Sequence, residues 1–189
     1  IEDDLVAAGV RDSKKIPKPE LARLSKRLRS MDPSVLRFAV ASVDEKVIDE
    51  INILQATFRV MTEAVHALQK QFDPTTRWDI RIDGDKIPPV LLKEIRATNG
   101  TSVIRAIPKG DTKEPTISTA SILAKWTRDE YMKEQAVLYP QYGFETNVGY
   151  VSSEHEKGLE TYGICPIHRK TFEPIKSWLQ GEKRPRRSS

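Results

Sequence analysis

The sequence has 189 residues, of which 38% are hydrophobic and 31% are charged, and its 31 Lys and Arg against 27 Asp and Glu give a net charge of +4. This length suits one domain with a sizeable core, and the composition excludes a chain that is disordered throughout. The mild positive charge permits a polyanionic partner without requiring one.

The single cysteine, Cys165, excludes an internal disulfide and a cysteine-rich structural zinc site. We therefore expect an intracellular, reducing compartment, namely cytoplasm, nucleus or mitochondrion. No run of about 18 apolar residues predicts a membrane span, and the acidic first residues do not resemble a signal peptide, so we expect no membrane partner. Because the sequence begins with Ile1 and not Met, we expect further residues upstream.

Apolar residues at helical spacing after Pro19 predict a short amphipathic helix that ends at Asp32 and Pro33. Residues 35–43 are rich in β-branched and apolar side chains, which predicts a buried strand. Asp44 is expected to cap the next helix. Residues 47–68 carry apolar side chains every three or four positions, which predicts a long packed helix.

The second part of the chain alternates strands and helices. Ile80 and Ile82 lie on one face of a short strand over Asp79–Asp83, which leaves Asp83 pointing the other way near the strand end. Further elements are expected as helix 89–97, strand 101–107, helix 117–139 and helices near 153–162 and 171–179. This alternation predicts an α/β layered fold over residues 1–180, followed by a flexible basic tail at 181–189.

Two aspartates stand at positions where metal ligands occur in α/β proteins. Asp83 ends a predicted strand, and Asp111 follows Gly110 just before a predicted helix. Turn formation alone explains Asp83 and Asp85, and helix capping alone explains Asp111. If the carboxylates of Asp83 and Asp111 converge, they repel each other until hard cations neutralise them, and together they supply half of a two-metal site.

The carboxyl-terminal third contains aromatic and cysteine motifs. Tyr142 and Phe144 are expected to pack in the core, whereas Tyr150 is more open to a functional role. Cys165 and His168 are adjacent enough in sequence to suggest a nucleophile and its base, but catalytic pairs are assembled in space, so we reject that interpretation. His168, Arg169 and Lys170 are expected to be phosphate contacts or surface charges.

Several segments together resemble the signature series of the ribonuclease HII (type 2 ribonuclease H) family, in matching order and approximate spacing over about Val10 to Pro174. The matching segments are Asp12-Ser13-Lys14-Lys15, Ile48-Asp49 with Asn52-Ile53-Leu54-Gln55-Ala56-Thr57, Ile82-Asp83-Gly84, Lys109-Gly110-Asp111, Ser118-Thr119-Ala120-Ser121-Ile122-Leu123-Ala124-Lys125, Thr127-Arg128-Asp129, Tyr139-Pro140-Gln141-Tyr142-Gly143-Phe144 and Cys165-Pro166-Ile167-His168-Arg169.

This resemblance implies a ribonuclease H-like mixed sheet flanked by helices, with a helical carboxyl-terminal region. It implies an endonuclease that hydrolyses the RNA strand of RNA-DNA hybrids and cuts 5′ to single ribonucleotides in duplex DNA, in DNA replication and repair. Asp83 and Asp111 match two of the four catalytic carboxylates of the family, which bind Mg²⁺ or Mn²⁺, two ions in all. Accessory protein subunits are not predictable from the sequence.

The resemblance also implies substrate contacts. Tyr150 matches the tyrosine that stacks on the deoxyribose after the ribonucleotide, and Ser13, Lys14, Lys125 and Arg169 match polar positions near the substrate backbone. For Lys125, an ordinary surface lysine on a helix is an equal alternative.

The other two family carboxylates lie in an Asp-Glu-Ala-Gly-Arg-Gly segment, which residues 1–189 do not contain. We expect a complete enzyme whose first strand lies upstream of Ile1; the alternative is a true fragment. Two further hypotheses remain at this point: a catalytically inactive nucleic-acid-binding module of the same fold, and another nuclease of the same broad fold, such as a resolvase, which would not need Tyr150.

Overall fold

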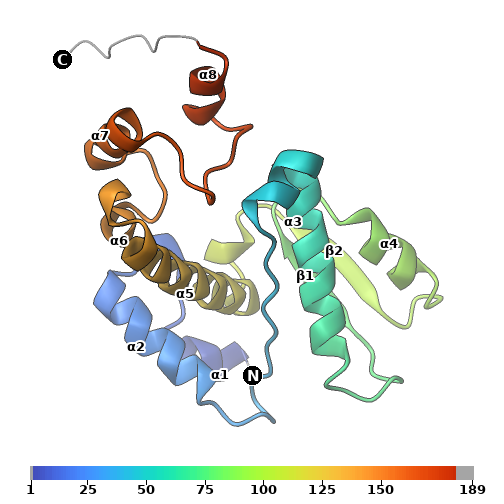
Figure 1. Cartoon of the computed structure of the whole chain (residues 1–189). Coiled ribbons are helices and arrows are strands. Elements are labelled where there is room, and N and C mark those ends of the chain that lie inside the picture. The colour runs from blue at the N-terminus through green and yellow to red at the C-terminus, as the bar shows by residue number, and fades with distance from the viewer. Residues whose placement is uncertain (1, 182–189) are drawn as a thin grey trace. The chain divides into compact units, whose positions relative to one another are not determined.

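The computed structural model describes residues 2–181, and the predicted basic tail lies outside these residues apart from Gly181. The elements in chain order are α1 (Glu2–Ala7), η1 (Ser13–Lys15), α2 (Lys18–Arg29), α3 (Glu45–Gln69), β1 (Asp79–Asp83), α4 (Pro89–Arg96), β2 (Val103–Ile107), η2 (Gly110–Thr112), α5 (Pro115–Leu138), η3 (Pro140–Tyr142), α6 (Phe144–Asn147), α7 (Ser153–Tyr162) and α8 (Ile175–Leu179) (Figure 1).

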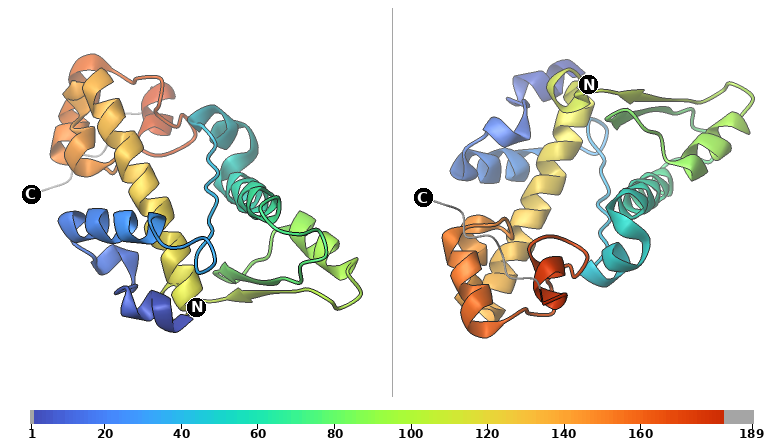
Figure 2. Two further views of the ribbon diagram at one scale, coloured as in Figure 1. Left: turned by 90° about the horizontal axis from the view of Figure 1, so that it is seen from below. Right: turned by 90° about the horizontal axis from the view of Figure 1, so that it is seen from above.

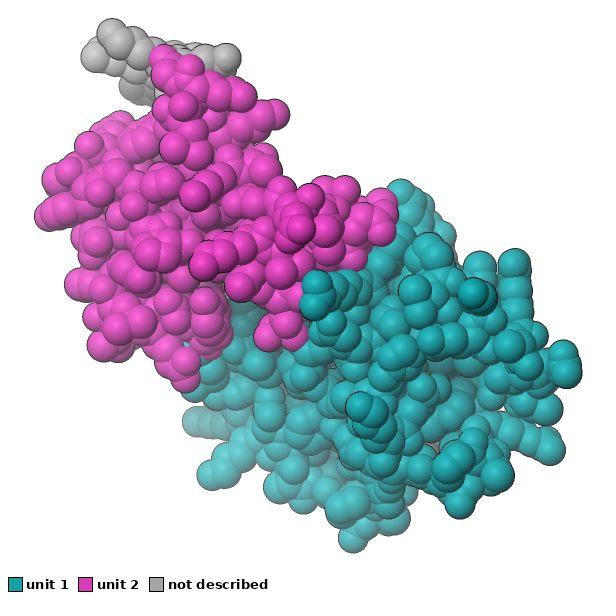
Figure 3. All heavy atoms as spheres, turned by 45° about the vertical axis from the view of Figure 1, so that its right-hand side comes forward, with its two compact units in different colours: residues 1–41, 58–130 teal, residues 42–57, 131–189 magenta. Residues whose placement is uncertain are grey.

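The chain divides into two compact units (Figure 3). Unit 1 comprises residues 1–41 and 58–130, and unit 2 comprises residues 42–57 and 131–189. No helix among the described residues is long and apolar enough to span a membrane.

Unit 1 contains a parallel pair of strands, β1 and β2, in which Asp83 lies opposite Ile107. Side chains alternate along a strand, so Ile80 and Ile82 share a face and Arg81 and Asp83 point to the other. Ile80 and Ile82 are buried in a cluster with apolar residues of α3 and α4, and both helices lie along this face of the sheet (Figure 2). The predicted strand and its orientation are therefore confirmed.

A second cluster of unit 1 is helical. It joins α1, α2 and the first half of α5 through the buried residues Leu5, Leu21, Leu24, Leu28, Ile122 and Leu123. The three leucines of α2 recur at helical spacing, as predicted, and each fully buried leucine contributes about 1.5–3 kcal/mol. This cluster supports the segment from η1 to the start of α2.

Unit 2 has an aromatic core. Tyr142 and Phe144 are each 1% exposed and stack with ring centroids 5.3 Å apart, and the Tyr142 hydroxyl donates to the Gly163 carbonyl at 2.9 Å. The other members of this core are Met132, Val148, Leu159, Cys165 and Ile175. The prediction that Tyr142 and Phe144 pack in the core is confirmed.

The predicted buried strand over Val35–Val43 is wrong. These residues form no strand, and Val40 is 42% exposed. β-Branched composition favours extended backbone, but a strand also needs a neighbour that pairs with its N–H and C=O groups. Among the described residues only β1 and β2 pair as a sheet, so this segment has no strand beside it.

The long helix is present as α3, and its predicted cap is confirmed because the Asp44 carboxylate accepts from the Val47 amide at 2.9 Å. However, Asn52 interrupts it with φ 65° and ψ 164°. The Asn52 side-chain oxygen then accepts from the amides of Leu54 and Gln55 at 3.0 and 3.1 Å, as a cap does at the start of a new helix. The element is therefore two helical segments.

Gly158 of α7 packs directly against the chain before it, since a Cβ there would lie 2.4 Å from the backbone carbonyl oxygen of Gln141. We predict that Gly158→Ala lowers the free energy of unfolding by about 1–3 kcal/mol, because the backbone must shift to admit a methyl group. Glu160→Ala, on the exposed side of the same helix, should change it by less than about 0.5 kcal/mol. Urea denaturation measures both variants, and equal stability of the two would contradict the packing described.

Candidate functional site

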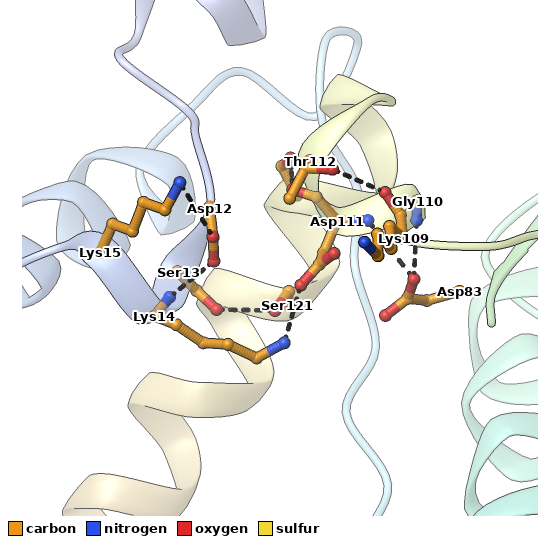
Figure 4. A network of polar contacts seen from close by, with 11 residues as sticks. Asp12, Ser13, Lys14, Lys15, Asp83, Lys109, Gly110, Asp111, Thr112 and Ser121 are labelled. Carbon is orange, nitrogen blue, oxygen red and sulfur yellow. Dashed lines mark hydrogen bonds and ion pairs between the residues drawn. The ribbon is translucent and has the colours of Figure 1, made fainter.

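Asp83 lies at the carboxyl end of β1 and binds the loop that follows β2. Its Oδ1 accepts from the Gly110 amide at 2.8 Å and, with a longer contact of 3.4 Å, from the Asp111 amide (Figure 4). A carboxylate that accepts backbone N–H groups forms charge-assisted hydrogen bonds. Asp83 therefore joins the ends of the two parallel strands and brings Asp111 beside itself.

The loop that carries Asp111 has a tightly specified backbone. Lys109 is left-handed, with φ 56° and ψ 41°, and a Cβ at Gly110 would lie 2.5 Å from the Ile117 Cδ1 atom. The Ser118 hydroxyl donates to the Asp111 carbonyl at 2.6 Å. Asp111 itself is 5% exposed, so its carboxylate is held in place near the end of the sheet.

Two residues of η1 complete this part of the site. Ser13 is buried, and its hydroxyl lies 2.8 Å from that of Ser121 on α5, so this side chain fastens η1 to the helix. Lys14 has a side chain that is 78% exposed, and its ammonium donates to the Asp111 Oδ2 at 3.1 Å. The Asp111 hydrogen bond and then the Asp111 charge raise the pKa of Lys14, with smaller contributions from Asp12 and Asp83.

The structure thus brings together four of the predicted site residues, Asp83, Asp111, Ser13 and Lys14, within unit 1. Carboxylate oxygens are the ligands that Mg²⁺ and Mn²⁺ prefer, and Mg²⁺ is commonly held by one or two carboxylates together with water and substrate phosphate. Among residues 2–181 no group of three or more His, Cys, Asp or Glu side chains is arranged to hold a metal ion. The two carboxylates present are therefore donors of the kind that fits a hard cation.

Lys125 lies on α5 and is paired with an acid one helical turn later. Its ammonium contacts both carboxylate oxygens of Asp129, at 3.1 and 2.8 Å. The Lys125 side chain is half-buried, whereas that of Asp129 is only 8% exposed. This pair satisfies a buried carboxylate, which is a structural role that was not predicted.

The remaining predicted contacts, Tyr150 and Arg169, belong to unit 2. Tyr150 is 72% exposed in the turn between α6 and α7. The Arg169 guanidinium lies over the Phe172 ring, with 3.8 Å between its Cζ and the ring centroid. Tyr150 thus presents an aromatic face to solvent, while Arg169 stacks on its neighbour.

A pair of buried histidines was missed by the sequence prediction. His155 and His168 are 5% and 6% exposed, and their Nε2 atoms lie 2.9 Å apart. The expectation that His168 is a phosphate contact or a surface charge is therefore wrong. Burial, and then the charge of His155, lowers the pKa of His168 to about 4, so the ring is neutral at physiological pH.

The interpretation of Cys165 as a nucleophile is rejected on geometry as well. His168 Nδ1 accepts from the backbone amide of Cys165 at 2.8 Å, so this nitrogen is occupied. Burial also raises the pKa of the Cys165 thiol, which disfavours the reactive thiolate. Only the packing of η3 and α7 around His168 reveals its burial; the flanking Arg169 and Lys170 suggest the opposite.

Comparisons with known proteins agree with one another. The family model described as Ribonuclease HII matches residues 1–175. A curated ribonuclease HII from Shouchella clausii (strain KSM-K16) is 38% identical over 181 residues, which are 96% of this chain and 62% of that protein. The chain therefore spans less than two thirds of the length of this relative.

Among solved structures, ribonuclease H2 from Pyrococcus horikoshii OT3 aligns with a TM-score of 0.72 and 26% identity, covering 95% of this chain and 84% of that one. The RNase HII of a PCNA complex from Archaeoglobus fulgidus gives 0.68 at 21% identity, over 92% and 83% of the two chains. Bst-RNase HIII in complex with Mn²⁺ aligns with a TM-score of 0.67 and 16% identity, covering 97% of this chain and 61% of that one. The fold is that of the ribonuclease H2, HII and HIII structures, which confirms the predicted α/β class.

The contacts of Asp83 predict a difference between two substitutions. Asp83→Ala should lower the free energy of unfolding by about 1–3 kcal/mol, because the amides of Gly110 and Asp111 lose their acceptor. Asp83→Asn keeps an acceptor oxygen, so its free energy of unfolding should fall by less than that of Asp83→Ala. Urea denaturation in EDTA measures both, and an alanine variant as stable as the asparagine variant would show that Asp83 does not anchor the loop.

The buried pair predicts acid sensitivity. The folded pKa of His168, about 4, lies below its ordinary value of 6.5, so folding favours the neutral ring. This stabilisation is complete above pH 6.5 and is lost as the pH falls towards 4, a change of about 3 kcal/mol. The titratable groups that face His168 are His155, Cys165 and Tyr142, and the last two are neutral in this range.

Unfolding free energies measured by urea between pH 7.5 and 4.5 test this expectation. His168→Asn, which keeps an acceptor for the Cys165 amide, should flatten the acid side of the curve. His66→Gln, at the partly exposed third histidine, is measured beside it as the comparison variant. If the free energy of unfolding of His168→Asn falls with acid as steeply as that of the wild type, His168 is not the source of the acid sensitivity.

Proposed function

The chain belongs to the ribonuclease HII family, and on that premise we propose that it is a divalent-metal-dependent endonuclease acting on RNA-DNA hybrids. It cuts the RNA strand, and it cuts 5′ to single ribonucleotides in duplex DNA. The products carry 3′-hydroxyl and 5′-phosphate ends. The metal is Mg²⁺ or Mn²⁺, and the relative Bst-RNase HIII is described with Mn²⁺.

One observation carries this proposal: the Asp83 carboxylate accepts the amides of Gly110 and Asp111 and so gathers two acids at one end of the sheet. Asp83 and Asp111 would hold the cation. When bound, such an ion lowers the pKa of a water molecule and stabilises the charge that develops on the phosphate. Asp83 and Asp111 would hold the ion next to the scissile phosphate, and no protein nucleophile takes part.

Lys14 has a second part in this proposal. Its ammonium is mostly exposed and contacts Asp111 Oδ2, so it already lies where a phosphate oxygen would approach the carboxylates. A lysine ammonium binds phosphate as a point charge. Lys14 therefore attracts the substrate backbone while it stays in contact with Asp111.

The proposed substrate contacts of unit 2 are Tyr150 and Arg169. The exposed Tyr150 ring offers a flat apolar face on which a deoxyribose packs, and a 2′-hydroxyl at that sugar would crowd the ring. Arg169 contacts a backbone phosphate, and in unit 1 Lys125 does the same from the solvent side of its pair with Asp129.

A second candidate function is a nucleic-acid-binding protein of this fold without catalysis. The observation that favours it is the absence of a third acidic metal ligand beside Asp83 and Asp111 among residues 2–181. A pair of ions bound by protein groups takes three or four carboxylates. In the family, two of these belong to the Asp-Glu-Ala-Gly-Arg-Gly segment, which residues 1–189 do not contain.

We predict that the full-length protein, with Mg²⁺ or Mn²⁺, cleaves a DNA duplex containing one ribonucleotide on its 5′ side. Asp83→Asn and Asp111→Asn should each lower the rate by about 100-fold or more, because the loss of a direct ligand exceeds the 10–100-fold typical of the groups that support ligands. The matched control is Asp85→Asn, an exposed acid in the same turn, which should cleave like the wild type.

Denaturing gels with a 5′-labelled strand measure the rate and the position of the cut. Cleavage that is unchanged in Asp83→Asn or Asp111→Asn would defeat the assignment of the active site. Binding of the same duplex without cleavage in either metal would favour the second candidate.

A further inference from the structure

The buried histidines of unit 2 form a hydrogen-bonded chain with the backbone on both sides. His168 Nδ1 faces the Cys165 amide at 2.8 Å, the two Nε2 atoms face each other at 2.9 Å, and His155 Nδ1 faces the Tyr150 carbonyl oxygen at 3.1 Å. Every ring nitrogen of the pair therefore has one partner, and the two end partners are backbone groups.

The chemistry of these backbone groups decides where each proton lies. A backbone amide only donates, so His168 Nδ1 accepts and the proton of the neutral ring lies on Nε2. His168 Nε2–H then donates to His155 Nε2, which must be unprotonated. The proton of His155 consequently lies on Nδ1 and donates to the Tyr150 carbonyl, so the chain of donors runs in one direction from Cys165 to Tyr150.

This chain fixes the backbone of Tyr150 from one side, and Asn147 fixes it from the other. The Tyr150 amide donates to the Asn147 carbonyl at 2.9 Å. The Asn147 side chain is itself tied to the Tyr142 carbonyl at 2.7 Å and to the Gly149 amide at 2.8 Å. Both backbone groups of Tyr150 are thus satisfied by the fold while its ring remains exposed.

We propose that His155, supported by His168, is a positioning residue that sets the direction of the Tyr150 ring and thereby the affinity for a ribonucleotide followed by deoxyribose. The inference rests on the proposed contact of Tyr150 with that sugar. It goes beyond that contact because it assigns the orientation of the ring to two buried side chains of a different segment, α7 and the loop before α8.

The surroundings of the pair enforce this pattern. Tyr142 and Phe144 pack edge-on against His155, with ring centroids 6.1 and 5.4 Å away, and Tyr142 packs likewise against His168 at 4.9 Å. A second proton on His168 would face the Cys165 amide, and a second proton on His155 would face the donor of His168. Both rings must stay neutral for the whole chain of hydrogen bonds, from the Cys165 amide through the two Nε2 atoms to Tyr150, to form.

Two substitutions of His155 separate its two contacts. In His155→Asn the side-chain amide reaches the position of Nδ1 and can still donate to the Tyr150 carbonyl, while the contact with His168 is lost. In His155→Gln the amide oxygen reaches the position of Nε2 and can accept from His168, while the contact with Tyr150 is lost. Thermal unfolding of both variants verifies that each is folded at the assay temperature.

The readout is binding of the protein, in EDTA, to a fluorescent duplex with one ribonucleotide and to the all-DNA duplex of the same sequence. We expect Tyr150→Ala to weaken binding of the first duplex by roughly tenfold, the size typical of an aromatic stacking contact. His155→Gln should lose most of the same affinity, and His155→Asn should stay within about twofold of the wild type. In the Tyr150→Ala background His155→Gln should cause no further loss.

Equal weakening by His155→Gln in the presence and absence of the Tyr150 ring would overturn the inference, because the two residues would then act separately. Wild-type affinity of His155→Gln would overturn it as well. Both results leave the proposed function standing if Tyr150→Ala still weakens binding. If Tyr150→Ala binds like the wild type, the proposed sugar contact fails and the inference fails with it.

The proton positions have a test that does not involve nucleic acid. Nitrogen-15 spectra of the histidine rings at pH 7 should show His155 protonated on Nδ1 and His168 protonated on Nε2. Any other assignment of these tautomers would overturn the chain of donors and therefore the inference.

Discussion

The hydrogen bonds from the amides of Gly110 and Asp111 to the Asp83 carboxylate are the contacts on which the rest of the site depends. They join the end of β1 to the loop after β2, and this loop places Asp111. Asp111 in turn holds Lys14, which belongs to a segment fastened to α5 by Ser13. Since one carboxylate both orders the backbone and belongs to the proposed active centre, its removal affects stability and function together.

The parts of the fold that the sequence predicts well are those set by local patterns. The leucines of α2, the alternating burial of β1 and the Asp44 cap of α3 depend on neighbours a few residues away. The segment Val35–Val43 has the composition of a strand, yet a strand exists only where another one pairs with it, and that is a property of distant residues. The break at Asn52 has a local cause, since Asn adopts positive φ more readily than most residues, but an apolar pattern continuing on both sides conceals it.

The same division applies to the site. Asp83, Asp111 and Tyr150 could be singled out as candidates because each combines a characteristic residue with a strand end or turn, and the resemblance to ribonuclease HII raised these weak signals together. The burial of His168 was not predictable, because it stands next to two cations in the sequence, and only the tertiary packing of Tyr142 and Phe144 encloses it. The partner of Lys125 one turn along α5 was available from helical spacing, and it changes that lysine from a surface charge to the counter-ion of a buried acid.

A common feature of the candidate side chains explains why sequence patterns single them out without showing how they are held. Each one is held through its own backbone groups. The Ser118 hydroxyl donates to the Asp111 carbonyl, His155 Nδ1 bonds to the Tyr150 carbonyl, and the Tyr150 amide donates to the Asn147 carbonyl. Nearly every residue has the same backbone groups, so the sequence does not show which of them are hydrogen-bonded or by which distant residue. The Tyr150 ring is consequently exposed while its main chain is fully bonded, and the residues that bond this main chain include His155 of α7.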